Sequence, residues 1–260
     1  MIEANPRASR TVPFISKATG VPLAKAAACL MSGVRLFELG LPDDARQLDW
    51  FCMKEAVMPW GRFPGADVVL GPEMKSTGEV MGIAKSYPEA YAKTQLAIDY
   101  ALPSPGKGKV FISVCDRDKR HILSLARILH HLGFSICSTA GTARVLRGGN
   151  VKCEVVDKIS GPHDGALPNV GDMIARGEIA LIINTPYGQG SRGDGYRLRT
   201  EAIRRGVTCV TALTAANAYV AAVEAVREAG AVASGAAVAA AGSGMEVIAL
   251  QDLPQHDLKL

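Results

Sequence analysis

The sequence lacks several features that would fix its class at once. Its six cysteines form no CxxC pair, which argues against a zinc site and favours reduced thiols in a cytosolic protein. Its net charge of +4 at pH 7 is too small to indicate nucleic-acid binding. No apolar run approaches the roughly 20 residues of a membrane-spanning helix, and the amino terminus has no apolar signal core. We therefore expect a soluble, cytoplasmic protein with no nucleic-acid or membrane partner.

Long regular elements are also scarce in the first hundred residues. Apolar spacing there predicts helices over 23–32 and 88–99, the second capped by Ser86, and a strand over 54–58. Clusters of Pro and Gly between these elements indicate turns. Because the segment shows no obvious core of its own, we expect residues 1–102 to be an incomplete part of a larger domain. The Pro/Gly-rich stretch that follows is typical of a linker.

Short apolar runs alternate with helical patterns over residues 108–230, and residues 231–260 are expected to form a tail. Each run is typical of a strand buried on both faces: 110–114, 134–137, 151–156, 180–185 and 207–213. Helices are predicted over 118–132, 143–147, 170–176, 195–205 and 215–228, with Asp118 as the cap of the first. This alternation predicts an α/β fold, a five-stranded parallel sheet of Rossmann-like type wrapped by helices.

Polar side chains gather near the predicted carboxyl ends of these strands, the edge at which open parallel sheets bind ligands. They offer hydroxyls, an amide and two ammonium groups beside a predicted helix amino terminus. The residues are Ser113, Lys119, Thr139, Thr142, Lys158, Asn184 and Thr185. No carboxylate–histidine pair stands out there, and the glycine-rich loop 188–195 lacks the setting of a dinucleotide site. The group predicts a pocket that holds an anion rather than one that breaks a bond. For each residue alone, an ordinary polar strand end is the competing interpretation.

Three stretches carry a specific resemblance to a known family: EANPRASRTVPF at residues 3–14, SKATG at 16–20 and GPEMKSTGEVMG at 71–82. They resemble the end of the second ATP-grasp unit of the carbamoyl-phosphate synthetase large chain. Residues from Lys109 to about Gly230 resemble the methylglyoxal-synthase-like allosteric domain of the same large chain. The resemblance therefore implies an incomplete ATP-grasp segment (1–102), a methylglyoxal-synthase-like domain (108–230) and a tail (231–260).

The resemblance also implies roles for single residues in the first segment. Glu3 and Asn5 match metal ligands beside the nucleotide phosphates, and hard oxygen donors of this kind suit Mg²⁺. Arg7 and Arg10 match catalytic-site positions that hold phosphate, a task that suits guanidinium groups. Glu55 matches a residue that binds ornithine in family members regulated by it. Without the family, an ordinary surface turn would be the preferred interpretation of residues 3–10.

In the second domain, the resemblance implies that the pocket binds a nucleotide monophosphate effector. In the family a pyrimidine nucleotide inhibits, and a purine nucleotide is a candidate activator. Pro186 stands where some relatives have an effector-contacting threonine, and Cys209 stands where ornithine-regulated relatives have a tyrosine. Residues 160–169 also lack the Gly-Gly-Asp-Gln motif of methylglyoxal synthases. These departures argue against ornithine control and against synthase activity.

The parent activity implied is ATP-dependent synthesis of carbamoyl phosphate from bicarbonate and glutamine-derived ammonia, for pyrimidine and arginine biosynthesis. The resemblance implies that the intact parent uses ATP and Mg²⁺ or Mn²⁺, with K⁺ as a further candidate ion. It also implies a glutaminase small chain as partner and a homo-oligomeric state. Because most of the phosphate-binding machinery is missing from these 260 residues, we expect no turnover by them alone. A stand-alone methylglyoxal-synthase-like phosphate lyase and a gene fragment without its own function are the alternatives.

Overall fold

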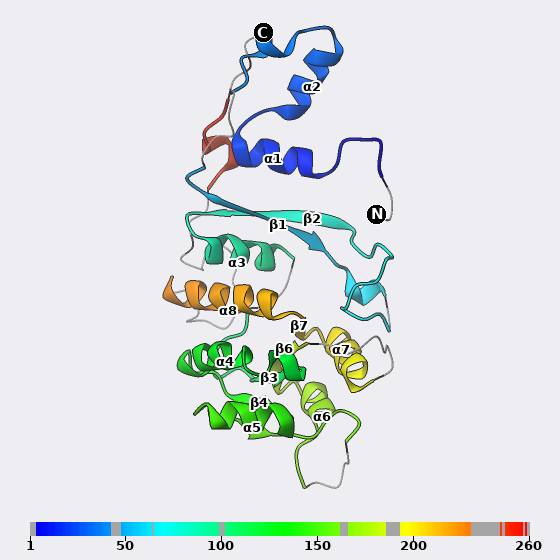
Figure 1. Cartoon of the computed structure of the whole chain (residues 1–260), viewed down its shortest axis with the longest axis vertical. Coiled ribbons are helices and arrows are strands. Elements are labelled where there is room, and N and C mark those ends of the chain that lie inside the picture. The colour runs from blue at the N-terminus through cyan, green and yellow to red at the C-terminus, as the bar shows by residue number, and fades with distance from the viewer. Residues whose placement is uncertain are drawn as a thin grey trace.

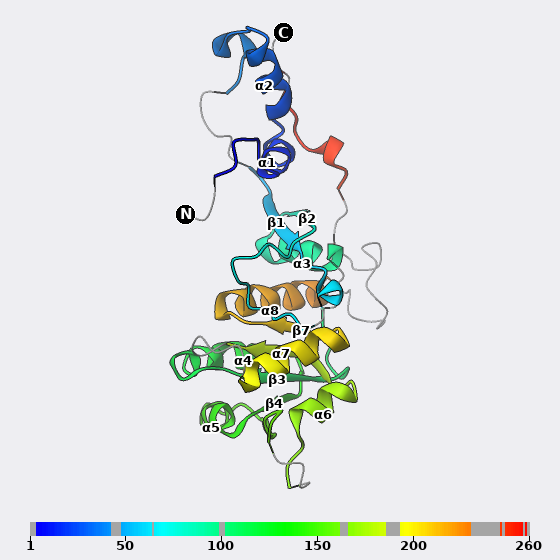
Figure 2. The same cartoon turned by 90° about the vertical axis from the view of Figure 1, so that its right-hand side faces the viewer.

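The structure is a computed structural model that describes residues 4–42, 48–63, 65–98, 102–161, 166–185, 193–229, 245, 248–256 and 258. The described elements follow one another along an elongated molecule, with a parallel sheet at one end and two short helices at the other (Figure 1). The same order of layers is seen after a quarter turn (Figure 2).

The parallel sheet has the strand order β5-β4-β3-β6-β7, and each neighbouring pair runs parallel. Its strands are β3 (Lys109–Ser113), β4 (Ile136–Ser138), β5 (Glu154–Val155), β6 (Ile179–Asn184) and β7 (Thr208–Val210). The predicted five-stranded α/β fold is therefore confirmed. The outer strands are shorter than the predicted apolar runs, because parts of those runs lead into or out of the sheet without joining the ladder.

Helices cover both faces of this sheet: α4 (Ile122–His131), α5 (Ala140–Gly148), α6 (Val170–Ala175), α7 (Asp194–Arg205) and α8 (Leu213–Glu228). Alternate strand residues point to opposite faces. Val110 and Ile112 join one buried cluster with α4, α5 and α8, whereas Phe111 joins another with α6 and α7. Two-sided burial explains why the strands are continuous apolar runs in the sequence.

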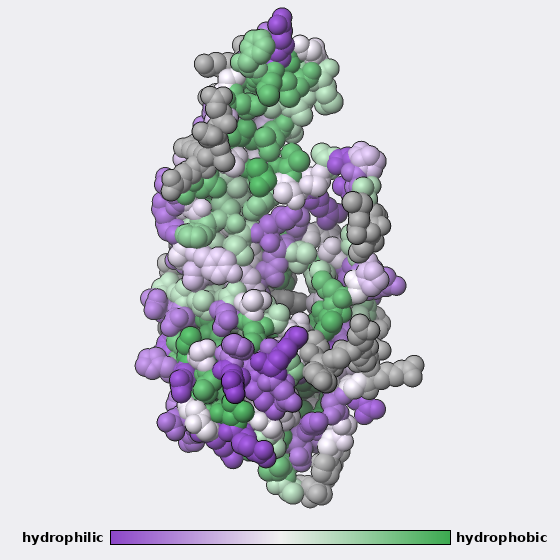
Figure 3. Space-filling model, in the orientation of Figure 1, coloured by the Kyte–Doolittle hydropathy of each residue, from purple (hydrophilic) through white to green (hydrophobic). Residues whose placement is uncertain are grey.

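The first segment is built on an antiparallel pair, β1 (Phe51–Val57) and β2 (Gly78–Ala84), covered by α3 (Tyr87–Ala97). The Ser86 hydroxyl accepts a hydrogen bond from the Glu89 amide and caps α3, as predicted. Around this unit lie α1 (Thr11–Thr19), α2 (Leu23–Met31) and the short 3-10 turns η1 (Leu36–Leu39), η2 (Trp60–Arg62) and η5 (Leu250–Asp252). Apolar surface gathers at the α2 end, where Met31, Leu36 and Phe37 are exposed (Figure 3).

The sequence analysis missed two elements and placed one helix start and its cap wrongly. It did not predict α1 or β2. The helix expected from residue 118 starts at Ile122, because residues 116–118 form a 3-10 turn, η3 (Asp116–Asp118). Asp118 therefore caps no helix, and its carboxylate instead accepts a hydrogen bond from the Cys115 thiol at 3.1 Å.

The two segments are in direct contact. Helix α3 packs along α8, and Ala92, Ala222, Val226 and Met245 form a small buried cluster between and beside them. Residues 248–256 lie near α1, where the His256 amide donates to the Gly20 carbonyl at 2.9 Å. The domain bounds expected above stay predictions, but α3 has contacts on both sides of the expected linker.

Candidate functional site

A pocket of about 550 Å³ opens at the carboxyl edge of the parallel sheet. Its lining comes from the ends of β3, β4 and β5 and from the residues that follow them: Ser113, Val114, Lys119, Thr139, Ala140, Gly141, Thr142, Val155, Val156, Asp157, Lys158, Ser160, Gly161 and Leu167. Five of the seven residues predicted for this site are in that lining, so the shared sheet edge brings them together.

The amino terminus of α5 forms one side of the pocket. Thr139 is its N-cap residue but makes no side-chain cap hydrogen bond, and the first turn holds no acidic residue. The Lys119 ammonium reaches this turn, since a Cβ atom added at Gly141 would lie 3.3 Å from Lys119 Nζ. A helix amino terminus carries partial positive charge and free N–H groups. Together with the ammonium group, it forms a site suited to an anion.

Two hydroxyl groups extend this polar surface. Ser113 Oγ lies 3.4 Å from Thr139 Oγ1, so the ends of β3 and β4 meet at the pocket wall. Thr142, buried in the first turn of α5, accepts a hydrogen bond from the Val114 amide at 3.4 Å. Hydroxyl groups rotate to donate or accept, so those of Ser113 and Thr139 can turn toward a phosphate oxygen.

Both lysines of the pocket face a carboxylate. Lys119 Nζ lies 2.5 Å from an oxygen of Asp116, and Lys158 Nζ lies 3.7 Å from an oxygen of Asp194 at the start of α7. Asp194 also accepts a hydrogen bond from Ser160. Because such partly exposed pairs contribute little free energy, an incoming anion can compete for either ammonium group.

Asn169, the residue before the predicted helix 170–176, fixes the loop that carries Lys158. Its side chain donates to the Lys158 carbonyl at 2.8 Å and accepts from the Gly171 amide at 2.8 Å, so it caps α6 and ties the loop to it. Asp157 was also missed. It is one of the lining residues, and its backbone pairs with residues 168–170. Asn is a common N-cap residue, so Asn169 just before an apolar helical pattern is the signal in the sequence that points to this arrangement.

Asn184 and Thr185 lie at the predicted edge but outside the pocket lining. The Asn184 amide donates to the Ser113 carbonyl at 2.9 Å, and its oxygen accepts from Arg199 Nη1 at 2.9 Å. The Thr185 hydroxyl accepts from the Cys115 amide at 3.0 Å. Both side chains are buried and connect β6 to the end of β3. In this structure they brace the wall of the pocket.

Helix α1 and strand β1 lie apart from the parallel sheet that carries this pocket, and α3 and α8 lie between them (Figure 1). Glu3 is outside the described residues, whereas Asn5, Arg7 and Arg10 lie on the exposed turn before α1. No group of three metal-ligating side chains was found within the described ranges. The amide oxygen of Asn5 is a donor type that suits Mg²⁺.

Glu55 is half-buried on β1 and is held by α3. Its carboxylate accepts hydrogen bonds from Thr94 Oγ1 at 2.9 Å and from Gln95 Nε2 at 2.5 Å. Burial raises the pKa of Glu55 above that of an ordinary glutamate, and the two hydrogen bonds oppose this rise. The residue therefore sits where β1 and α3 meet.

Comparison with known proteins first defines the class of the second domain. Residues 121–211 match the family model described as an MGS-like domain. A crystal structure of methylglyoxal synthase from Elizabethkingia anophelis NUHP1 aligns with 45% of this chain and 79% of that chain, at 13% identity and a TM-score of 0.35. That score is too low to support the assignment, which rests on the sheet order and the family match.

Most of the chain is similar in sequence to carbamoyl phosphate synthase large chains. It is 51% identical over 227 residues to the large chain of Methanothermobacter thermautotrophicus, covering 87% of this chain and 21% of that protein. It is 49% identical over 235 residues to the "large chain, C-terminal section" of Methanopyrus kandleri, covering 88% and 42%. The chain is thus a relative of the C-terminal part of the carbamoyl phosphate synthase large chain, and spans less than half the length of either protein.

One further finding concerns membranes. Across the described ranges, no helix combines the length and apolarity needed to cross a bilayer.

Proposed function

We propose that the pocket binds a nucleotide monophosphate, and that residues 109–229 act as an allosteric effector domain for carbamoyl phosphate synthesis carried out elsewhere in the whole protein. The observation that carries the proposal is the convergence of the α5 amino terminus, the Lys119 ammonium and the Ser113 and Thr139 hydroxyls on one pocket. Backbone N–H groups and cations together bind phosphate strongly.

The rest of the pocket suits the other parts of a nucleotide. A volume of about 550 Å³ is within the range usual for small-molecule sites. Val114, Val155, Val156 and Leu167 are apolar residues of the lining, and the phosphate-binding groups lie beside the amino terminus of α5. The lining thus combines polar and apolar residues, as a site for a nucleoside monophosphate requires.

Calorimetric titration of the full chain with uridine and inosine monophosphates tests this proposal. Lys119→Gln should weaken binding by about 10- to 100-fold, the range expected when a charge-assisted hydrogen bond worth about 1.5–3 kcal/mol is lost. Lys152→Gln is the matched control, because Lys152 is an exposed lysine outside the pocket lining and should leave affinity unchanged. No binding by the unaltered chain, or equal weakening by both variants, would refute the proposal.

In the whole protein, we propose that this effector domain regulates a cytoplasmic, ATP-dependent, glutamine-using ligase that serves pyrimidine and arginine synthesis. Residues 1–102 would then belong to its second ATP-grasp unit. Glu3 and Asn5 would hold Mg²⁺ or Mn²⁺, and Arg7 and Arg10 would hold phosphate. The metal would neutralise phosphate charge there. A glutaminase small chain, K⁺ and a homo-oligomeric state complete this proposal, and Glu55 remains a candidate regulatory position.

The 260 residues themselves are expected to be inactive as a synthetase. Phosphoryl transfer requires a phosphate cradle, metal and acceptor site in one place, and the first segment holds only a few of these groups. Purified chain incubated with ATP, bicarbonate and ammonia should form no carbamoyl phosphate above background. Turnover above background would overturn this expectation.

A phosphate lyase is the second candidate, and one observation favours keeping it. Asp157 is among the lining residues of a phosphate-type pocket, and proton abstraction beside a bound phosphate ester needs a base of this type. Incubation with dihydroxyacetone phosphate should release no methylglyoxal if the effector proposal holds. Formation of methylglyoxal that is lost in Asp157→Asn would favour the lyase instead.

A further inference from the structure

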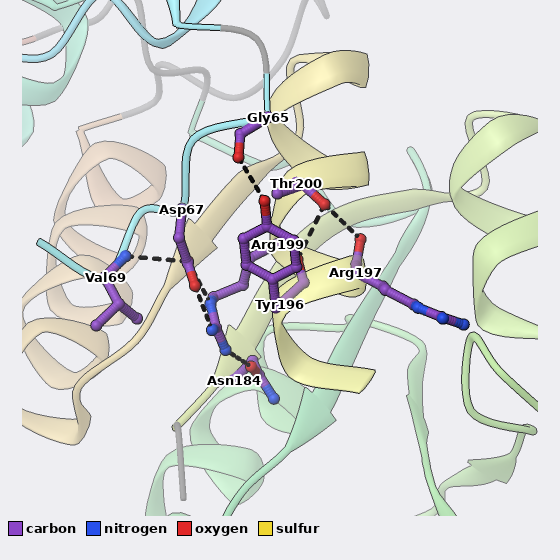
Figure 4. A network of polar contacts seen from close by, with 8 residues as sticks. All are labelled: Gly65, Asp67, Val69, Asn184, Tyr196, Arg197, Arg199 and Thr200. Atoms are coloured by element: carbon purple, nitrogen blue, oxygen red, sulfur yellow. Dashed lines mark hydrogen bonds and ion pairs between the residues drawn. The ribbon is translucent and has the colours of Figure 1, made fainter. Parts of the chain in front are cut away.

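Helix α7 contacts both the pocket and the first segment. At its first residue, Asp194 lies 3.7 Å from the Lys158 ammonium of the pocket. Two residues further on, the Tyr196 hydroxyl donates to the Gly65 carbonyl at 2.6 Å. Arg199 follows in the next turn and reaches Asp67 (Figure 4).

The Arg199–Asp67 pair is the main polar connection along this face of α7. Arg199 Nε and Nη2 donate to the two Asp67 oxygens at 2.6 and 2.5 Å, and the two side chains are only 6% and 17% exposed. Such a buried, two-pronged pair between residues 132 positions apart fixes geometry more than it adds stability. It sets the position of residues 65–69 relative to α7.

A third nitrogen of Arg199, Nη1, connects this pair to the pocket through hydrogen bonds. It donates to Asn184, which in turn donates to the Ser113 carbonyl, and the Ser113 hydroxyl lines the pocket. Gly195 leaves room for this contact, because a Cβ atom there would lie 2.8 Å from Arg199 Nη1. A continuous set of hydrogen bonds therefore joins the pocket wall to Asp67.

We propose that α7 transmits effector binding from the pocket to residues 65–69. The phosphate of the effector and the Asp194 carboxylate compete for the Lys158 ammonium, so binding releases Asp194 and lets the start of α7 move. Tyr196 and Arg199 move with it and carry the change to Gly65 and Asp67. This inference rests on the proposed effector function and names the helix through which it acts; Asp194, Arg199 and Asp67 are positioning residues.

The test combines affinity with hydrogen exchange on the full chain, using uridine monophosphate, inosine monophosphate and inorganic phosphate as probes. The Val69 amide is a natural reporter, because it donates to Asp67 Oδ1 at 3.1 Å. Probe binding should change exchange in residues 65–69. Asp194→Asn removes the competing charge, so it should tighten binding by about two- to fivefold, as expected for a partly exposed ion pair, and reduce the exchange response.

Glu201→Gln is the matched control for Asp194→Asn. It removes one negative charge from the same helix, but Glu201 pairs with Arg204 and Arg205 rather than with the pocket. It should leave affinity and exchange unchanged. Asp67→Asn tests the other end, because it keeps the side-chain shape and weakens the Arg199 pair; it should retain probe affinity but lose the exchange response.

The outcomes separate this inference from the function on which it rests. Binding of a probe with no tightening in Asp194→Asn, or with no response in residues 65–69, overturns the role of α7 and leaves the effector pocket intact. Failure of all three probes to bind overturns both. Tightened binding in Asp194→Asn and a response lost in Asp67→Asn support the coupling, because together they show that the pocket end of α7 and its Asp67 end both take part in it.

Discussion

Glu55 shows how the fold changes the chemistry of a single residue. Burial raises its pKa, so the folded chain holds the proton more tightly than the unfolded chain does. Between the ordinary glutamate pKa and the raised folded value, the unfolded state is therefore the one with fewer protons bound. The contribution of Glu55 to the free energy of unfolding then falls as pH rises through this window, and the loss persists at neutral pH.

We therefore predict a pH-dependent effect of Glu55→Gln. The variant keeps an oxygen acceptor for Thr94 and Gln95 but cannot ionise, so its stability relative to the unaltered chain should be greater at pH 7 than at pH 4. Denaturant unfolding at the two pH values measures this. Glu73→Gln is the control with the opposite sign, because the Lys75 hydrogen bond lowers the pKa of Glu73. An equal effect of Glu55→Gln at both pH values would contradict the prediction.

The sequence predicts which residues line the pocket where those residues lie at the ends of strands. Ser113, Thr139 and Lys158 follow apolar strands, and parallel strands end at one edge, so these residues line one pocket. Asn184 follows the same rule but is turned to brace Ser113 by Arg199. That partner comes from the middle of α7 and has no signal in the strand pattern.

At the scale of elements, the contact between β2 and α3 depends on one glycine. A Cβ atom at Gly82 would lie 2.1 Å from the Ala90 carbonyl oxygen and 3.0 Å from Thr94 Cγ2. The backbone of α3 cannot yield without moving the helix off the strand. At Gly78 in the same strand, the added Cβ would meet only Val57 Cγ2 at 4.0 Å.

We therefore predict that Gly82→Ala destabilises the fold by about 2 kcal/mol or more, as overpacking against a fixed backbone does. Gly78→Ala, the matched control in the same strand, should change stability by less than about 0.5 kcal/mol. Chemical denaturation measures both. A Gly82→Ala variant as stable as the control would show that α3 does not approach β2 so closely.

The elements that sequence analysis found and missed differ in burial. Strands β3 and β6 are buried on both faces and therefore appear as continuous apolar runs. Helix α1 is short, contains no buried residue and has Pro13 in its first turn, so its sequence gives only a weak helical signal. Strand β2 begins at Gly78 and contains Gly82, which resembles a turn in the sequence although Gly82 serves the approach of α3.

At the scale of the whole molecule, stability should be uneven. In the parallel-sheet domain, buried side chains come from both faces of the sheet, and α3 is attached to it through α8. At the other end, α1 has no buried residue and α2 has only Ala26. Regions with few buried contacts open at lower free energy than the core does.

Limited proteolysis should therefore remove residues 4–42 before it cuts the connection at 102–108. The reason is that α3, on the amino-terminal side of this connection, packs on α8, while Pro103 is itself buried. A time course followed by mass spectrometry measures the order of cuts. Early cleavage at 102–108 that releases two separate halves would instead support independent domains with the bounds expected from the sequence.

The most direct test of the central claim is to locate a bound phosphate group by nuclear magnetic resonance. Titration of isotope-labelled chain with uridine or inosine monophosphate should shift the amides of Gly141 and Thr142 saturably, because these N–H groups begin α5 beside Lys119. The amide of Gly171, which already donates to Asn169, provides an internal comparison and should shift little. Saturable shifts at other sites with none at Gly141 and Thr142, or no saturation with either nucleotide, would contradict the account.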